Sequence, residues 1–144
     1  VRQNKPLSVM LQSNPLLLSG VKAAHRVVDG WTEVSLFVGS ATVTGCGIQS
    51  PECESGLALD VGARRYLTAS RLTGYVGLNI HYLSEGIRFI DHRAAMINGN
   101  LGLHWQTWSG FAMGMGYTHF VYYDQKRSQV ARQGWLSVEI GRSF

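Results

Sequence analysis

Residues 134–144 read GWLSVEIGRSF, and this stretch decides the fold. Its large apolar side chains Leu136, Val138 and Ile140 alternate with small or charged ones such as Ser137 and Glu139. A period of two residues is typical of an extended strand whose two faces meet different surroundings. The polar face is compact, since it holds one carboxylate, two hydroxyls and a glycine. The stretch therefore predicts a strand with one apolar face and one narrow polar face.

Length and composition favour an all-β protein. The 144 residues are expected to form a single domain, residues 1–144, with 17 glycines, 15% charged residues and 45% apolar residues. No uninterrupted apolar run approaches the ~18 residues that a membrane-spanning helix needs. The mean hydropathy is −0.01, which is the value expected when each strand sends half of its residues to each side.

The formal charge of +4 is a mild basic excess. Its lysines and arginines are scattered rather than gathered on one helix, so we expect no nucleic-acid partner. No signal peptide precedes Val1, and an exported protein would therefore be present here in its processed form.

Seven further segments repeat the alternation and, with the last one, make eight candidate strands. The connections after the second, fourth and sixth strands are short, whereas those after the third, fifth and seventh are long and polar. Such alternation is typical of transmembrane β-barrels, although the first connection is short where a long one is expected. We therefore predict a closed antiparallel up-and-down transmembrane β-barrel of about eight strands. The predicted strands are residues 7–12, 16–28, 31–43, 57–67, 72–83, 95–105, 111–123 and 134–144.

The two faces of the predicted strands differ in charge. On the apolar face, the charged and histidine side chains lie within a few residues of strand ends, where the cost of facing lipid falls toward zero. They are His25, Arg65, His119 and Arg142. The polar face carries three cations and three anions, as an enclosed lumen requires, because an unpaired buried ion costs several kcal/mol. This predicted luminal charge network is Lys22, Arg26, Glu33, Asp60, Arg64 and Glu139.

In this alternation and loop rhythm the chain resembles the small eight-stranded outer-membrane β-barrel proteins, such as the transmembrane domain of outer membrane protein A and outer membrane protein X. In that class a terminal aromatic residue, here Phe144, is part of the signal read by the outer-membrane assembly machinery. The resemblance covers almost the whole chain and implies a location in the bacterial outer membrane, in contact with its lipid. Function does not follow from the architecture alone. Aromatic side chains near strand ends match an interfacial girdle: Trp31, Tyr82, Trp105, Trp108, Tyr117, Tyr123 and Phe144.

A set of amides and imidazoles shares the polar face. These side chains can satisfy one another in a polar core, or the two histidines can bind a metal. The first interpretation is favoured, and we expect no metal and no cofactor. An eight-stranded barrel is just wide enough for side chains to fill it, which favours a packed lumen over an ion-paired gate in a pore. The predicted luminal polar cluster is Asn79, His81, Asn98, Asn100 and His104.

Two cysteines, Cys46 and Cys53, lie in the segment TGCGIQSPECESG. Glycine, proline and serine mark a loop, and a pair this close can form a disulfide in an oxidising compartment. A zinc site would need two further ligands nearby, and no histidine or cysteine is adjacent. We therefore expect a disulfide between Cys46 and Cys53.

Basic residues recur in two of the predicted external loops. Arginine suits bidentate contacts with phosphate, so these loops can bind lipopolysaccharide, or they can be ordinary solvated loops. Strand edges near them offer a second mode, in which a partner protein pairs with the edge. The candidate lipopolysaccharide-binding residues are Arg88, Arg93, Lys126, Arg127 and Arg132.

The favoured function is thus structural or interactive, without catalysis. One alternative is a lipid-modifying enzyme, an acyl hydrolase or transferase, that uses outward-facing His119 or His25. The chain resembles the lipid A deacylase family in size, but that family uses a His-x-Ser pair, and here Val121 stands two residues after His119. A second alternative is a soluble lipocalin-like carrier, in which the apolar face would line a cavity.

Overall fold

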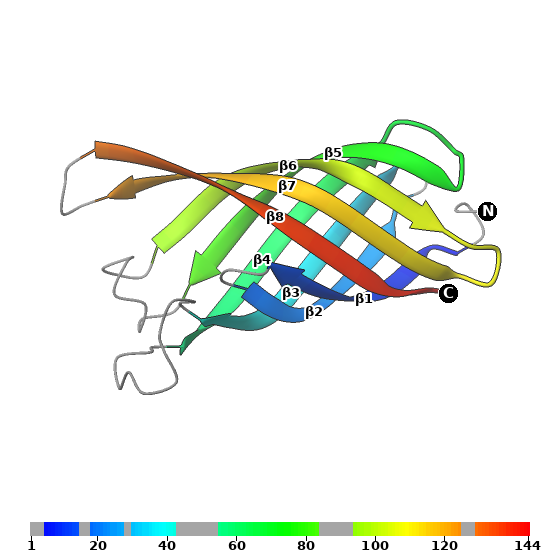
Figure 1. Ribbon diagram of the computed structural model, residues 1–144, viewed down its shortest axis with the longest axis horizontal. Coiled ribbons are helices and arrows are strands. Elements are labelled where there is room, and N and C mark those ends of the chain that lie inside the picture. The colour runs from blue at the N-terminus through cyan, green and yellow to red at the C-terminus, as the bar shows by residue number, and fades with distance from the viewer. Residues whose placement is uncertain (1–4, 15–17, 28–29, 43–54, 84–93, 125–128) are drawn as a thin grey trace.

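The computed structural model contains eight β-strands (Figure 1) and describes residues 5–14, 18–27, 30–42, 55–83, 94–124 and 129–144. The alternation seen in the sequence accounts for these strands, since each one exposes apolar side chains on one side only. The strands are β1 (Leu7–Asn14), β2 (Leu18–Arg26), β3 (Thr32–Thr42), β4 (Ser55–Tyr66), β5 (Leu72–Leu83), β6 (Ala94–Gln106), β7 (Phe111–Asp124) and β8 (Gln129–Ser143).

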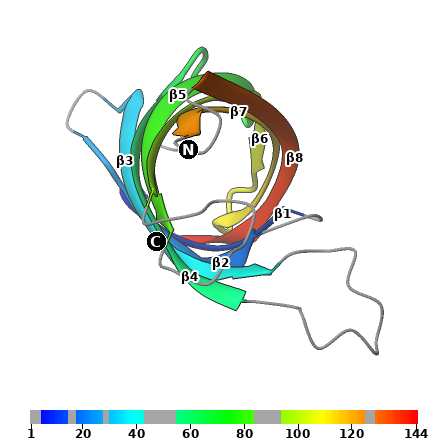
Figure 2. The ribbon, with the colours of Figure 1, turned by 90° about the vertical axis from the view of Figure 1, so that its left-hand side faces the viewer.

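The sheet closes into a barrel in which every strand pairs antiparallel with its neighbours in sequence. Closure is made by β1 and β8, whose register runs from Ser8↔Ser143 to Ser13↔Val138. Figure 2 looks along the barrel and shows the strands as a ring around the lumen. The predicted all-β, closed, up-and-down barrel of eight strands is confirmed. Among the described residues, no helix is long and apolar enough to span a membrane.

The barrel has two different ends. We call the end with the connections 27–31, 67–71 and 107–110 the turn end, and the end with the connections 15–17, 43–54, 84–93 and 125–128 the loop end. Gly30 and Gly110 take positive φ values of 70° and 96° in the turns, a conformation that glycine adopts without steric cost. The first residue of β1 and Phe144 pair at the turn end, where Phe144 N donates to Leu7 O at 2.7 Å.

The faces of the strands are assigned as the sequence predicts. Leu136, on the apolar parity of β8, is 68% exposed on the outside of the barrel, whereas Glu139, on the other parity, is 3% exposed in the lumen. The same contrast holds on all eight strands, with Leu, Val and Ile outward and most polar groups inward. Four larger side chains, Met10, Phe37, Tyr66 and Tyr75, also point inward and are buried.

The last strand begins earlier than predicted. A loop was expected from residue 124 to residue 133, but β7 and β8 remain paired to Asp124↔Gln129, which leaves only residues 125–128 between them. The run QVARQ is polar enough to be taken for a loop, yet Val130 and Arg132 keep the outward parity. Arg132 is therefore an exposed strand residue, and its placement in a loop was wrong. The first connection, 15–17, is indeed short.

Candidate functional site

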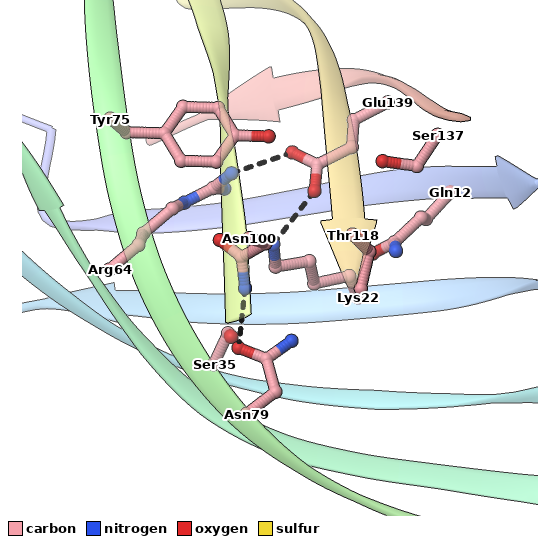
Figure 3. A pocket seen from close by; sticks show the side chains of 10 residues that line it. All are labelled: Gln12, Lys22, Ser35, Arg64, Tyr75, Asn79, Asn100, Thr118, Ser137 and Glu139. Carbon is pink, nitrogen blue, oxygen red and sulfur yellow. Dashed lines mark hydrogen bonds and ion pairs between the residues drawn. The ribbon is translucent and has the colours of Figure 1, made fainter. Parts of the chain in front are cut away.

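The centre of the lumen is an ion-paired cluster around Glu139 on β8 (Figure 3). Lys22 on β2 donates to Glu139 Oε1 at 2.8 Å, and Arg64 on β4 donates from Nη1 to Oε2 at 2.9 Å. Each oxygen of the carboxylate thus accepts one cation. Charge-assisted hydrogen bonds of this kind are the strong ones in proteins, so the cluster ties three parts of the barrel wall together across the lumen.

Arg64 also binds a second carboxylate. Its Nε donates to Glu33 Oε1 at 2.6 Å, and Tyr66 donates its hydroxyl to Glu33 Oε2 at 2.9 Å. Arg26 lies farther from the same carboxylate, with Nη2 3.9 Å from Oε2. The guanidinium of Arg64 therefore bridges Glu33 and Glu139, a role that suits its planar set of donors.

Two tyrosines enclose the Arg64 guanidinium. Its Cζ lies 5.0 Å from the ring centroid of Tyr75 and 5.5 Å from that of Tyr66. Arg26 lies 5.7 Å from the Tyr66 centroid. These distances are within the ~6 Å range of cation–π attraction. Neither tyrosine was among the predicted site residues. Tyr66 lies two residues after Arg64 and therefore shares its inward face, a signal that could have placed it beside Arg64.

The third carboxylate, Asp60, joins the charge network to part of the predicted polar cluster. His81 Nδ1 lies 3.3 Å from Asp60 Oδ2, and Asn79 donates to the same oxygen at 3.2 Å. Asn100 in turn donates to Asn79 Oδ1 at 3.0 Å. The two sets that the sequence suggested separately are therefore in contact through Asp60.

The other two members of the polar cluster lie apart from this chain of contacts. The rings of His104 and Tyr66 pack in a T-shaped arrangement, with centroids 5.4 Å apart. Asn98 is 1% exposed and its side-chain amide makes no hydrogen bond to the rest of the described structure. Within the same residues, no group of three or more His, Cys, Asp or Glu side chains is arranged to hold a metal ion.

The lumen is filled by the fit of large side chains against glycines. A Cβ atom added to Gly116 would lie 2.4 Å from the Tyr75 hydroxyl oxygen, and one added to Gly39 would lie 2.5 Å from the Phe37 ring. These glycines therefore provide the space that the rings occupy. A polar cavity of about 20 Å³ remains in the lumen. It has room for roughly one water molecule. It is lined by Gln12, Lys22, Ser35, Arg64, Tyr75, Asn79, Asn100, Thr118, Ser137 and Glu139 (Figure 3).

The outward-facing histidines are exposed to different degrees. His119 is half-buried, and its Nδ1 lies 3.4 Å from the hydroxyl oxygen of Tyr117. Its partners in the sheet are Gly99 on β6 and Gly134 on β8. A Cβ at Gly99 would meet nothing within 4 Å, whereas one at Gly134 would collide with the Tyr117 ring. The missing side chain at Gly99 therefore leaves open space beside His119 on the outer surface. His25 is exposed on β2.

Other predicted site residues are placed as follows. The ring of Phe144 is exposed, and Arg142 Cζ lies 5.8 Å from its centroid. Arg132 lies outward on β8 toward the loop end. The remaining predicted residues fall outside the described residues: Cys46, Cys53, Arg88, Arg93, Lys126 and Arg127.

Comparison of the chain with protein-family models, with curated proteins and with solved structures found no match. Function must therefore be inferred from the barrel, from its two faces and from the contacts in its lumen.

Proposed function

We propose that this chain is an integral β-barrel of the bacterial outer membrane, with a packed lumen and a structural or interaction role. The observation that carries the proposal is the distribution of polarity. Large apolar side chains are exposed on the outside of all eight strands, while Glu33 and Glu139 are buried inside with the cations they contact. Asp60 is buried there beside His81 and Asn79. Soluble monomers rarely expose an apolar surface this extensive, and it matches a surface solvated by lipid.

The polarity also argues against the lipocalin-like alternative. A carrier of apolar ligands needs an apolar cavity and a polar exterior. Here the lumen holds Lys22, Arg64 and Glu139, and the cavity between them is about 20 Å³. This space is too small for an apolar ligand of ordinary size, since ligand pockets measure roughly 300 to 1,000 Å³.

The strand lengths support a membrane-spanning barrel. Strands β3 to β8 contain 11 to 15 residues, and a tilted strand needs about 9 to 11 residues to cross the hydrocarbon region. The shorter β1 and β2 contain 8 and 9 residues. In the proposed orientation the turn end faces the periplasm, as short turns do in this class of barrel. Phe144 would then present the final strand to the assembly machinery from that side.

The proposed interactions take place at the loop end. Arg132 is exposed there and can contact a phosphate of lipopolysaccharide, together with the cations of the loops. The edge of β8 offers a second contact. Within the residues that the structure describes, its pairing with β1 runs as far as Val138, whereas its pairing with β7 continues to Gln129. A partner protein can add an extended segment to such an edge by main-chain hydrogen bonds.

Three measurements test the proposal. A folded membrane barrel should migrate differently on a gel before and after boiling, and the unboiled form should resist protease in lipid vesicles. The packed lumen should give no steady conductance in a planar bilayer. Identical mobility before and after boiling, together with solubility without detergent, would refute a membrane barrel. A steady open conductance would refute the packed lumen alone.

A second candidate function, lipid modification, is favoured by one observation, the contact between Tyr117 and His119 on the outer surface. A histidine there can act as a general base toward a membrane lipid. Mass spectrometry of lipopolysaccharide and phospholipid incubated with the folded protein tests for acyl loss or transfer. We expect unchanged lipids. New products that vanish in His119→Ala and persist in the matched His25→Ala variant would establish an enzyme.

A further inference from the structure

An open hollow lies on the outer surface of the barrel at Gly99 on β6. The glycines that face outward on the described strands are Gly74, Gly99 and Gly134. Leu67 lies over Gly74, where an added Cβ would be 3.0 Å from Leu67 Cδ1, and the Tyr117 ring covers Gly134. A Cβ added to Gly99 would meet nothing within 4 Å. Neighbouring side chains therefore fill the missing volume at the other two glycines, whereas Gly99 leaves it open.

Large apolar side chains border this Gly99 hollow on three sides. Ile97 and Leu101, two residues to either side of Gly99 on β6, are 65% and 58% exposed. Leu78, the partner of Gly99 on β5, is 68% exposed. Residues four apart on a strand are separated by about 13 Å. The gap between the side chains of Ile97 and Leu101 therefore has room for a single hydrocarbon chain.

The fourth side of the Gly99 hollow is polar. His119, the partner of Gly99 on β7, is half-buried, and its Nδ1 lies 3.4 Å from the Tyr117 hydroxyl oxygen. When that hydroxyl donates to Nδ1, the ring proton is on Nε2, which can donate a hydrogen bond in turn. Hydrocarbon provides no acceptor, and an unsatisfied polar group in it is costly. A lipid that brings its own acceptor to the hollow therefore gains a hydrogen bond that plain hydrocarbon cannot make.

The position of His119 along β7 matches the level at which acyl chains are bonded to a lipid headgroup. His119 lies eight residues after Phe111, the first residue of β7 at the turn end. At about 3.4 Å per residue and a tilt of about 40°, this corresponds to about 21 Å along the membrane normal, in an apolar band about 25 Å tall. Arg132 lies two residues nearer to the loop end, opposite Val121. An ester group and a phosphate of one lipid can therefore meet His119 and Arg132 in that order.

We propose that the Gly99 hollow binds one acyl chain of lipopolysaccharide, with His119 donating to an ester carbonyl oxygen of that chain and Arg132 contacting the phosphate. This inference rests on the proposed function, including its contact with lipopolysaccharide at the loop end, and adds the place where the lipid part is bound. In the proposed orientation the loop end faces the outer leaflet, where lipopolysaccharide is found. Its acyl esters and its phosphates are carried by the same sugar unit, which suits neighbouring donors at His119 and Arg132.

The test measures the binding of lipid A, the acylated and phosphorylated part of lipopolysaccharide, by native mass spectrometry of the protein folded in phosphatidylcholine nanodiscs. We expect the wild type to retain lipid A in preference to phosphatidylethanolamine supplied in the same proportion. Gly99→Leu fills the hollow and His119→Leu removes the donor, so both prevent the same hydrogen bond. Each should lower the apparent association constant for lipid A by about five-fold. Ala23→Leu, an equivalent change on the outer face of β2 across the barrel, should leave it unchanged.

Equal binding of lipid A by the wild type, Gly99→Leu and His119→Leu would overturn the inference. Equal retention of lipid A and phosphatidylethanolamine by the wild type would overturn it too, because the hollow would then not select lipopolysaccharide. Arg132→Gln separates the inference from the proposed function. If this variant alone weakens the binding of lipid A, the loop-end contact stands and the Gly99 hollow has no part in it.

Gel mobility before and after boiling shows that each variant has folded. A wild-type protein whose mobility does not change on boiling would refute the membrane proposal and the inference with it.

Discussion

Replacing Glu139 with glutamine removes one charge from the centre of the lumen while nearly preserving the shape of the side chain. In the wild type, Glu139 accepts from Lys22 at 2.8 Å and from Arg64 at 2.9 Å, and the three side chains are at most 7% exposed. The substitution leaves the six-residue charge network with an excess of one positive charge. Lys22 then loses the carboxylate that it contacts, while its amine stays buried.

The expected cost follows from which cation loses its partner. Breaking a buried ion pair by removing one member costs about 3 to 5 kcal/mol. Arg64 keeps Glu33 at 2.6 Å, so the loss falls mainly on Lys22. We therefore expect Glu139→Gln to lower the free energy of unfolding by about 3 kcal/mol, the lower end of that range. Urea unfolding in lipid vesicles should show a lower midpoint with an unchanged slope.

Two further variants separate charge from packing. Ser137→Ala changes the neighbouring luminal position on β8, where the hydroxyl donates to Gly116 O at a long 3.4 Å, and should cost less than about 1 kcal/mol. Adding Lys22→Met to Glu139→Gln restores neutrality, so the double variant should be more stable than the sum of its single effects predicts. If Glu139→Gln unfolds within about 0.5 kcal/mol of wild type, the luminal charges are hydrated instead of paired, and the reasoning fails.

Three other perturbations test the packing, the membrane and the lumen. Gly116→Ala would place a Cβ 2.4 Å from the Tyr75 hydroxyl oxygen and should lower the free energy of unfolding by about 1 to 3 kcal/mol in the same urea assay. Gly99→Ala is the matched control, because its Cβ meets open space, and it should change that free energy by less than about 1 kcal/mol. Leu78→Arg, on the outer face near the middle of β5 and 68% exposed, should cost about 2 to 4 kcal/mol in lipid vesicles; no cost there would indicate a water-facing surface. Wild-type protein in a planar bilayer should show no steady current, because its central cavity is about 20 Å³; sustained channel openings would contradict this.

The faces of the strands could be predicted from the sequence because a period of two residues is a local property. Each residue's parity in residues 134–144 is set by its immediate neighbours, and Glu139 and Leu136 are found on the predicted sides. The charge balance of the lumen followed from the same parity. The partners of each ion did not, because pairing across the lumen depends on how far each strand is shifted against the next. No local pattern indicates that Arg64 reaches both Glu33 and Glu139.

Element ends were harder to predict than faces. The start of β8 was missed because residues 129–133 are mostly polar, and polarity is the usual signal of a loop. Hydrogen bonding to β7 overrides that signal, since Tyr123↔Val130 and Asp124↔Gln129 continue the ladder. The large aromatic side chains in the lumen were also missed as site residues. Their role depends on glycines such as Gly116 on distant strands, which leave space for Tyr75.

The luminal contacts join residues that are separated by very different lengths of chain. This difference links the charge network to the closure of the barrel. Asp60 and His81 are 21 residues apart, and Glu33 and Arg64 are 31 apart, so these pairs can form once neighbouring hairpins exist. Arg64 and Glu139 are 75 apart, and Lys22 and Glu139 are 117 apart. The contacts of Glu139 therefore form only when β8 has closed against β1, which brings it near β2 and β4. Until then Lys22 lacks its carboxylate, so its burial is favourable only in the closed barrel. The same ion pairs that fill the lumen thus oppose its opening.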